Sequence, residues 1–319
     1  MKTEDLPYAR AHISIFKQIF DSDISKWPGV LQSVHLLYGF IALTMIFYLF
    51  SFLINNHLDW RILLYLNPDS PVPVIDDLMI FVTDFSMPLF GLVFIFWEIG
   101  CQISKHTQIS RKTLAQGMKI IGTALSILIG SAHFWAGYEH SYVFFPLAII
   151  QFSAFWFMGN RIGQMDDASI DRFNRLFWLT GLAVLMTQIS VEVLKEAVAR
   201  PRPLSGDYAL YDRGIRMVAD EIVQSGYSYV AGHSATLFAM VMPLFFFTSK
   251  KCLRAGLILW ALVHAFSRVY LAAHFPYCSL MGAALGFSMG TLVFKIHGGI
   301  EHTPWISESM KHAGAAHYS

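Results

Sequence analysis

Three clusters of basic and imidazole side chains in the second half of the chain are suited to holding an anion and moving a proton. Each cluster adjoins a long apolar run, where an unpaired charge is costly unless it serves a site. The clusters are Lys195-Glu-Ala-Val-Ala-Arg-Pro-Arg202-Pro203, Gly226-Tyr-Ser-Tyr-Val-Ala-Gly232-His233-Ser234 and Ser267-Arg268-Val-Tyr-Leu-Ala-Ala-His274-Phe-Pro276-Tyr-Cys278. Together they predict one shared anion-binding pocket.

The first cluster lies at the end of an apolar run. Lys195 and Arg202 are seven positions apart, close to two helical turns, so both cations can face one pocket. Pro201 and Pro203 predict that the helix ends near residues 199–200, because proline disfavours helix continuation. The alternative is that both side chains only extend to lipid headgroups.

The second and third clusters bring two histidines to apolar boundaries. Gly232 precedes an apolar run, so the free N–H groups of a helix start would meet an anion beside His233. Arg268 and His274 are six apart, and Pro276 interrupts the chain before the last apolar run. A lone histidine at a membrane boundary can also be purely structural, so the interpretation depends on all three clusters together.

The composition indicates a chain that lies in lipid. Hydrophobic residues make up 55% of the 319 residues, charged residues 14%, and the mean hydropathy is +0.48, whereas soluble domains carry about 25% charged residues. A net charge of +1 without a sustained basic stretch excludes a nucleic-acid partner. Three cysteines without CxxC spacing predict neither a disulfide framework nor a cysteine zinc site, and no metal site is expected.

The apolar runs predict an all-α polytopic transmembrane bundle of about eight spans, since a bilayer core needs about 20 apolar residues per helix. A cytoplasmic segment (1–34) precedes the bundle (35–296), and a cytoplasmic tail (297–319) follows it. The windows are 35–54, 77–100, 117–137, 141–159, 176–198, 234–249, 255–273 and 278–296.

The distribution of lysine and arginine predicts the orientation, because cytoplasmic loops are enriched in both. With a cytoplasmic N-terminus, both termini lie inside and all three clusters lie on the extracytoplasmic side, periplasmic or luminal. The inside segments then carry Lys2, Arg10, Lys17, Lys26, Lys105, Arg111, Lys112, Arg161, Arg172, Arg175, Lys250, Lys251 and Arg254. The outside arginines at 200, 202, 213 and 216 need another explanation.

The order Lys-x6-Arg-Pro, Gly-His and Ser-Arg-x5-His resembles the type 2 phosphatidic acid phosphatase superfamily, over roughly residues 195–278. The run from Ser267 to Pro276 is especially similar to the glucose-6-phosphatase branch. The resemblance implies a catalytic core over about 176–296 and phosphate ester hydrolysis without a metal or other cofactor.

The resemblance also implies a role for each matching residue. Lys195, Arg202 and Arg268 would hold the phosphate oxygens, with backbone N–H groups of Ala231 and Gly232 as further donors. The two histidines would do the chemistry: His274 as the nucleophile that forms a phosphohistidine, and His233 as the acid that protonates the leaving oxygen.

Two positions depart from the family pattern. Ala231 stands where most members carry a serine, and Cys278 stands where most carry an aspartate that orients the nucleophilic imidazole. An uncompensated loss of the acidic partner predicts a slow enzyme. Glu192, three residues before Lys195, could compensate, although pairing with Lys195 is the simpler expectation.

These considerations predict an integral membrane phosphatase that acts on a lipid phosphate or pyrophosphate among membrane lipids. A sugar-phosphate phosphatase or a lipid phosphotransferase is the alternative within the same chemistry. A catalytically weakened relative that binds phosphorylated lipid is the alternative outside it, and the oligomeric state is left open.

Overall fold

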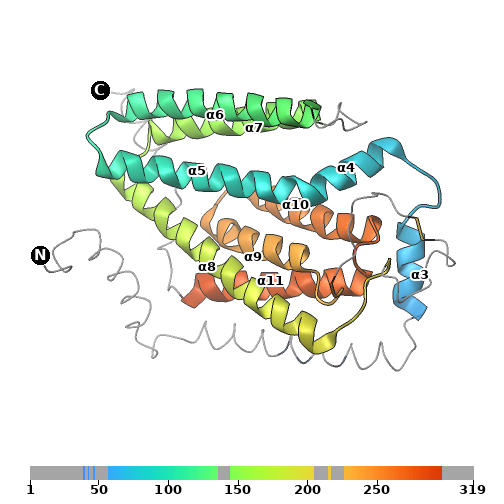
Figure 1. Cartoon of the computed structure of the whole chain (residues 1–319). Helices are drawn as coiled ribbons and strands as arrows, with labels where there is room; N and C mark the ends of the chain where they lie inside the picture. Colours follow the sequence, from blue (N-terminus) through green and yellow to red (C-terminus); the bar gives the residue numbers. More distant parts are fainter. Residues whose placement is uncertain are drawn as a thin grey trace, which may run out of the picture.

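The computed structural model describes residues 57–135, 144–204, 215–216 and 226–296, and the isolated positions 39, 42 and 46. Every regular element in these ranges is a helix (Figure 1). The helices are α3 (His57–Leu66), α4 (Pro73–Asp84), α5 (Ser86–His106), α6 (Arg111–Trp135), α7 (Phe144–Ile162), α8 (Asp167–Val198), α9 (Gly232–Phe247), α10 (Lys251–Tyr270) and α11 (Pro276–Ile296).

Four of these helices are long and apolar enough to cross a membrane, namely α5, α8, α10 and α11, and α9 is a shorter apolar helix. The chain is therefore an integral membrane protein with an all-helical bundle. The windows 117–137 and 141–159 correspond to α6 and α7. The window 35–54 falls outside the described ranges, so the total of eight spans stays a prediction.

The span expected over 77–100 needs a correction, because the helix is interrupted inside this window. Helix α4 ends at Asp84 and α5 begins at Ser86, with Phe85 between them. Pro88 explains the break, since it has no N–H to donate to the carbonyl of Asp84 and its ring clashes with that carbonyl. The span is therefore Ser86–His106, and α4 is a separate element.

Helix α9 is the centre of the bundle and packs against α8, α10 and α11 (Figure 1). Its residues from 234 to 243 are all buried, which suits a helix that is apolar on every side. Gly282, Gly286 and Gly290 on α11 face its backbone. A Cβ at Gly286 would come within 1.9 Å of the Ala235 carbonyl oxygen, so the two backbones are in direct contact.

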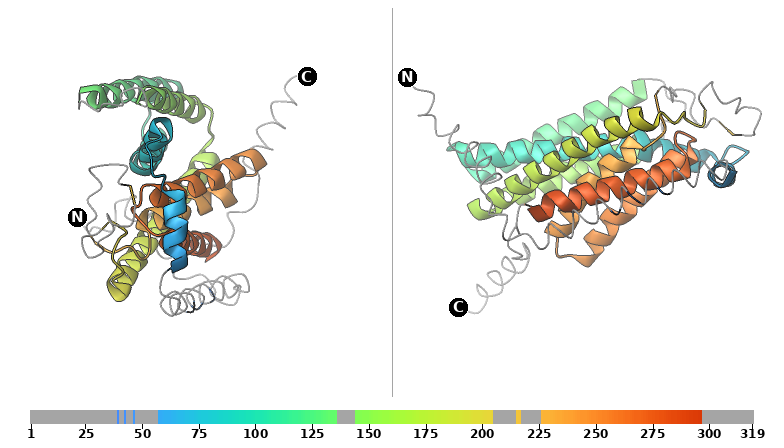
Figure 2. Two further views of the ribbon diagram at one scale, coloured as in Figure 1. Left: turned by 90° about the vertical axis from the view of Figure 1, so that its right-hand side faces the viewer. Right: turned by 90° about the horizontal axis from the view of Figure 1, so that it is seen from below.

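Helices α6 and α7 form a separate antiparallel pair that lies outside the group of α8 to α11 (Figure 2). Their contact is also close, because a Cβ at Gly122 would meet the Phe155 side chain at 2.4 Å. Helix α5 packs against both this pair and α8, where Phe94 of α5 makes an edge contact with Phe173 of α8.

The two ends of the bundle differ in charge. The connections at 107–110, 163–166 and 248–250 gather at one end, the left in Figure 1. Basic residues near these connections are Lys105, Arg111, Lys112, Arg161, Arg172, Arg175, Lys250, Lys251 and Arg254. The opposite end holds α3, the end of α8 and the start of α9. Which end faces the cytoplasm stays a prediction.

Candidate active site

Three helix ends meet at the end of the bundle opposite these basic connections. Helix α8 ends at Val198, with Ala199 in the left-handed region at φ 47° and its N–H bonded to the Lys195 carbonyl. The expected helix end near residues 199–200 is therefore confirmed. After α10, the N–H groups of Ala273 and His274 donate to the Arg268 carbonyl, at 3.0 and 3.1 Å. That tight turn aims His274 back toward the start of α9.

The five side chains expected from the sequence to do chemistry are brought together here. A Cβ at Gly232 would lie 3.7 Å from the Lys195 ammonium, so the end of α8 touches the start of α9. The charges of Arg268, Arg202 and Lys195 all act on the His233 ring. Arg268 and Arg202 also act on His274. The structure thus gathers these residues, while their roles remain predictions.

His274 is 1% exposed, and its Nδ1 lies 2.8 Å from the backbone carbonyl oxygen of Ser228. A carbonyl only accepts, so Nδ1 must carry the proton and Nε2 is left with the lone pair when the ring is neutral. Burial, and then the charges of Arg268 and Arg202, lower the pKa of His274 well below 6.5. The imidazole is therefore neutral near pH 7, as a nucleophile must be.

The Ser228 carbonyl occupies the role that the sequence assigned to a missing aspartate. Cys278 is fully buried and does not orient the imidazole; its sulfur accepts from the Arg200 guanidinium at 3.3 Å. Glu192 does not compensate either, because it pairs with Lys195 at 2.9 Å, as the simpler expectation had it. Sequence reasoning missed Ser228 because a backbone carbonyl leaves no residue-type signal.

A buried ion pair holds the backbone around Ser228 and His274 in place. Arg200 pairs with Asp59 of α3 at 2.7 Å, and both side chains are 8% exposed. The carbonyl of Arg200 accepts the Ser228 N–H at 2.7 Å, and Asp59 accepts the Tyr277 N–H at 3.0 Å. Asp59 is thus linked to Ser228 through Arg200, and to the start of α11, just after His274, through Tyr277. Arg200 is one of the unexplained outside arginines, and this contact accounts for it.

The backbone donors require one correction. The Ala231 N–H donates to the Cys278 carbonyl at 3.0 Å, so it is already used and is not an open phosphate donor. The reason is the direct packing of α9 on α11, which places this carbonyl over residue 231. In the part of the chain that the structure describes, no side chain caps α9, so the first N–H groups from Gly232 onward remain the donors expected for an anion.

Another histidine, which the sequence motifs did not single out, also lines this region. His264 lies one helical turn before Arg268 on α10 and is completely buried. Its ring stacks on His233 with centroids 6.3 Å apart and 18° between the planes. Its helical offset of four from Arg268 was visible in the sequence, but only the packing of α10 on α9 shows that it faces the site.

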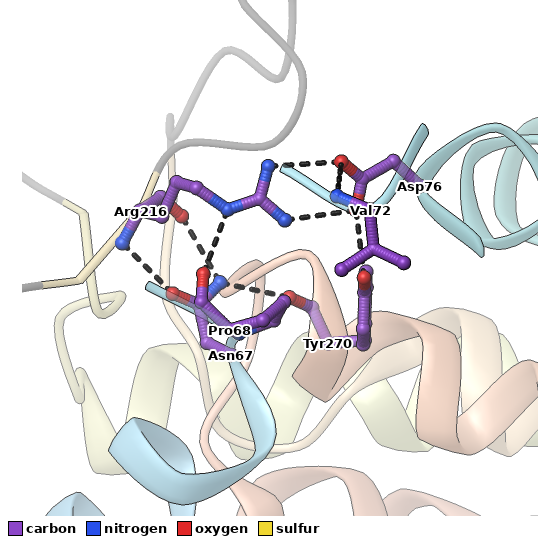
Figure 3. A network of polar contacts seen from close by, with 6 residues as sticks. All are labelled: Asn67, Pro68, Val72, Asp76, Arg216 and Tyr270. Carbon is purple, nitrogen blue, oxygen red and sulfur yellow. Dashed lines mark hydrogen bonds and ion pairs between the residues drawn. The ribbon is translucent and has the colours of Figure 1, made fainter. Parts of the chain in front are cut away.

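Arg216, another unexplained outside arginine, belongs to a polar network beside the site (Figure 3). Its guanidinium forms two bonds to Asp76 of α4, at 2.9 and 2.8 Å, and these bonds raise the pKa of Arg216 although burial opposes the shift. Tyr270 donates to Asp76 at 2.6 Å, and Asn67 donates to the carbonyls of Arg216 and Tyr270. The network ties Arg216 to the start of α4 and the end of α10.

The fold and the site define an integral membrane helical bundle with cations and histidines gathered at one end. Residues 176–301 match the family model of the PAP2 superfamily, and the resemblance noted in the sequence is confirmed. A curated relative is the lipid A 4'-phosphatase of Bacteroides thetaiotaomicron (strain VPI-5482), 25% identical over 124 residues. The match covers 38% of this chain and 54% of that protein. No solved structure matches.

Proposed function

We propose that this protein is a membrane phosphatase that hydrolyses a lipid phosphate or pyrophosphate through a phosphohistidine on His274. The observation that carries the proposal is the state of His274. It is buried, its Nδ1 lies 2.8 Å from the Ser228 carbonyl oxygen, and burial and two guanidinium groups lower its pKa, which favours the neutral ring. A site that attracts a phosphate dianion and keeps its nucleophile unprotonated is suited to phosphoryl transfer.

In the first step, the Nε2 lone pair of His274 attacks phosphorus and forms an N–P bond. The bond from phosphorus to the leaving oxygen breaks, and that oxygen takes a proton from His233, whose ring holds this proton once the negative charge of the bound phosphate offsets the nearby cations. Lys195, Arg202 and Arg268 stabilise the charge spread over the other phosphate oxygens. The Ser228 carbonyl stabilises the ring that becomes cationic, because the Nδ1–H then donates a stronger bond.

In the second step, water attacks the phosphohistidine. His233 takes a proton from that water, the N–P bond breaks, and inorganic phosphate leaves while His274 regains its lone pair. His233 therefore acts first as an acid and then as a base. Stacking on His264 holds its ring in one orientation for both steps.

The substrate class follows from the membrane location and from the curated relative, whose name describes action on lipid A. We infer a phosphorylated lipid that enters from the leaflet at the site's end of the bundle. The predicted orientation makes this the extracytoplasmic leaflet. The sugar-phosphate alternative is kept because of the run from Ser267 to Pro276, which is similar to the glucose-6-phosphatase branch.

Purified protein should be incubated with lipid phosphates, lipid pyrophosphates and sugar phosphates in buffer containing a chelator. We expect inorganic phosphate from at least one lipid substrate, and a phosphoprotein that is stable in base but labile in acid, as phosphohistidine is. His274→Ala should abolish both signals. Arg61→Ala, an exposed change on α3, is the matched control and should leave both intact. If the folded protein released phosphate from none of the lipid substrates, the proposal would be contradicted.

A phosphotransferase is distinguished by adding an unphosphorylated lipid acceptor to the same assay. Transfer would appear as a newly phosphorylated acceptor instead of free phosphate. The silent, lipid-binding alternative has less support once Ser228 is taken into account, because the imidazole is oriented without an aspartate. It would be favoured only if vanadate bound to the protein while no substrate was turned over.

A further inference from the structure

Helices α6 and α7 leave an open groove of about 740 Å³ along their pair, at a distance from the histidines described above. Polar side chains line one part of it: Lys112, Gln116 and Lys119 from α6, and Asn160 and Gln164 from α7. The residues on α6 are three to four apart, so they share one face of the helix. One part of the groove is therefore lined by polar side chains from both helices.

Polarity changes along the groove. The polar residues lie toward the end of the bundle where α6 begins and α7 ends, beside the connection at 163–166. Farther along α6 the lining becomes apolar at Ile120 and Ile127, which are 65% and 66% exposed. Trp156 lies between the two parts, which suits an amphipathic ring at a membrane boundary. The groove thus has a polar part and an apolar part, which match the headgroup and the acyl chains of a lipid.

The two lysines in the groove differ from their neighbours in pairing. Lys105 pairs with Asp171 and Arg111 pairs with Asp167. Within the described ranges, neither Lys112 nor Lys119 has a carboxylate partner. Lys119 instead lies over the Trp156 ring, with its ammonium 4.7 Å from the centroid. A cation inside a predicted span, without an acidic partner, indicates a site for an anion.

We propose that this groove binds one anionic phospholipid from the leaflet at the basic end of the bundle. Its headgroup phosphate lies between the side chains of Lys112 and Lys119, whose backbone positions are about 10 Å apart in helix rise, so that the two long side chains can converge on it. The amides of Asn160 and Gln164 donate to the remaining headgroup oxygens. An acyl chain follows Ile120 and Ile127 toward the middle of the bilayer. A free phosphate would leave this apolar half uncovered.

The test is native mass spectrometry of the full chain in a nonionic detergent, titrated with phosphatidylglycerol or with phosphatidylcholine of the same chains. We expect one tightly bound phosphatidylglycerol and much weaker phosphatidylcholine binding. The double change Lys112→Gln with Lys119→Gln should weaken phosphatidylglycerol binding about 30-fold, since each lysine near an anionic lipid contributes about fivefold. Phosphate release measured on detergent-solubilised substrate should stay the same, because the groove is apart from the site.

The matched control removes the same charge at the same end but outside the groove, with Lys250→Gln and Lys251→Gln. It should bind phosphatidylglycerol like the parent. Lys119→Arg, which keeps the charge, should also retain binding and guards against a fold defect in the glutamine variant. Equal losses in both double variants, or equal binding of the two lipids, would overturn the proposal. A soluble glycerol phosphate that binds as tightly as phosphatidylglycerol would overturn the lipid assignment.

Discussion

The cations near His274 have two effects in the proposed phosphate site. Guanidinium groups attract the substrate, and the same positive field opposes protonation of a nearby ring. In the proposed mechanism this opposition is useful, because His274 needs its lone pair to act as the nucleophile. Burial contributes in the same direction, and the Ser228 carbonyl decides which nitrogen keeps the proton.

The pH dependence of kcat/KM should reflect this depressed pKa. His274 becomes protonated, and so inactive, only at a pH well below 6.5. Lowering the pH through 6.5 should therefore not reduce the nucleophile's contribution, and its acidic limb should appear lower. The measurement is kcat/KM from about pH 4 to 9, corrected for the substrate's own phosphate ionisation. An acidic limb at or above pH 6.5 that persists in the corrected kcat/KM profile would contradict the assignment of His274.

The Cys278 thiol should contribute little to catalysis. We expect Cys278→Ala to keep kcat within about tenfold of the parent, because the Ser228 carbonyl orients the ring and Arg200 retains Asp59. Disabling an orienting carboxylate costs about 10⁴ in a serine hydrolase, so the two outcomes are easily separated. Steady-state phosphate release decides between them. A fall of about 10³ or more in a folded variant would show that Cys278 does the orienting.

At the level of elements, the contact of α9 with α11 controls the site, because it sets the start of α9 against the start of α11. A methyl group at Gly286 would overlap the Ala235 carbonyl at 1.9 Å, and backbone cannot move aside as a flexible side chain can. Gly286→Ala should therefore lower stability by about 1–3 kcal/mol and reduce phosphate release. The readouts are the melting temperature in detergent and the activity.

Gly256→Ala on α10 is the matched control, because nothing lies within 4 Å of its added methyl group. It should be neutral or stabilising by up to about 1 kcal/mol, as alanine favours helix. Equal melting temperatures for Gly286→Ala and Gly256→Ala would mean that α9 and α11 are not packed backbone to backbone.

Sequence reasoning located the helix ends of the site but not the contacts between them. Proline and cluster spacing predicted where α8 ends and where α11 begins, because those signals are local. The Ser228 carbonyl and the use of Ala231 by Cys278 depend on which backbones touch, and no residue type encodes that. Pro88 was a local signal for the break before α5, but the apolar composition of 77–100 outweighed it.

For the whole molecule, the separation of charge between the two ends bears on orientation. Basic residues gather at the short connections, where the exposed Cys252 also lies at the start of α10. The site histidines His233, His264 and His274 lie toward the other end, which also holds the exposed residues Asp69 and Ser70. If lysine and arginine mark the cytoplasmic side, the site faces away from the cytoplasm.

Cysteine labelling in intact cells tests this orientation with the chain's own thiol. Cys101 and Cys278 are buried, so a membrane-impermeant maleimide should see only Cys252 among the natural cysteines. We expect no labelling of the parent in intact cells and strong labelling after the membrane is opened. Ser70→Cys in a Cys252→Ser background should label in intact cells, because residue 70 lies at the site's end. Labelling of Cys252 but not of residue 70 in intact cells would place the site on the cytoplasmic side, and a substrate would then have to come from the inner leaflet.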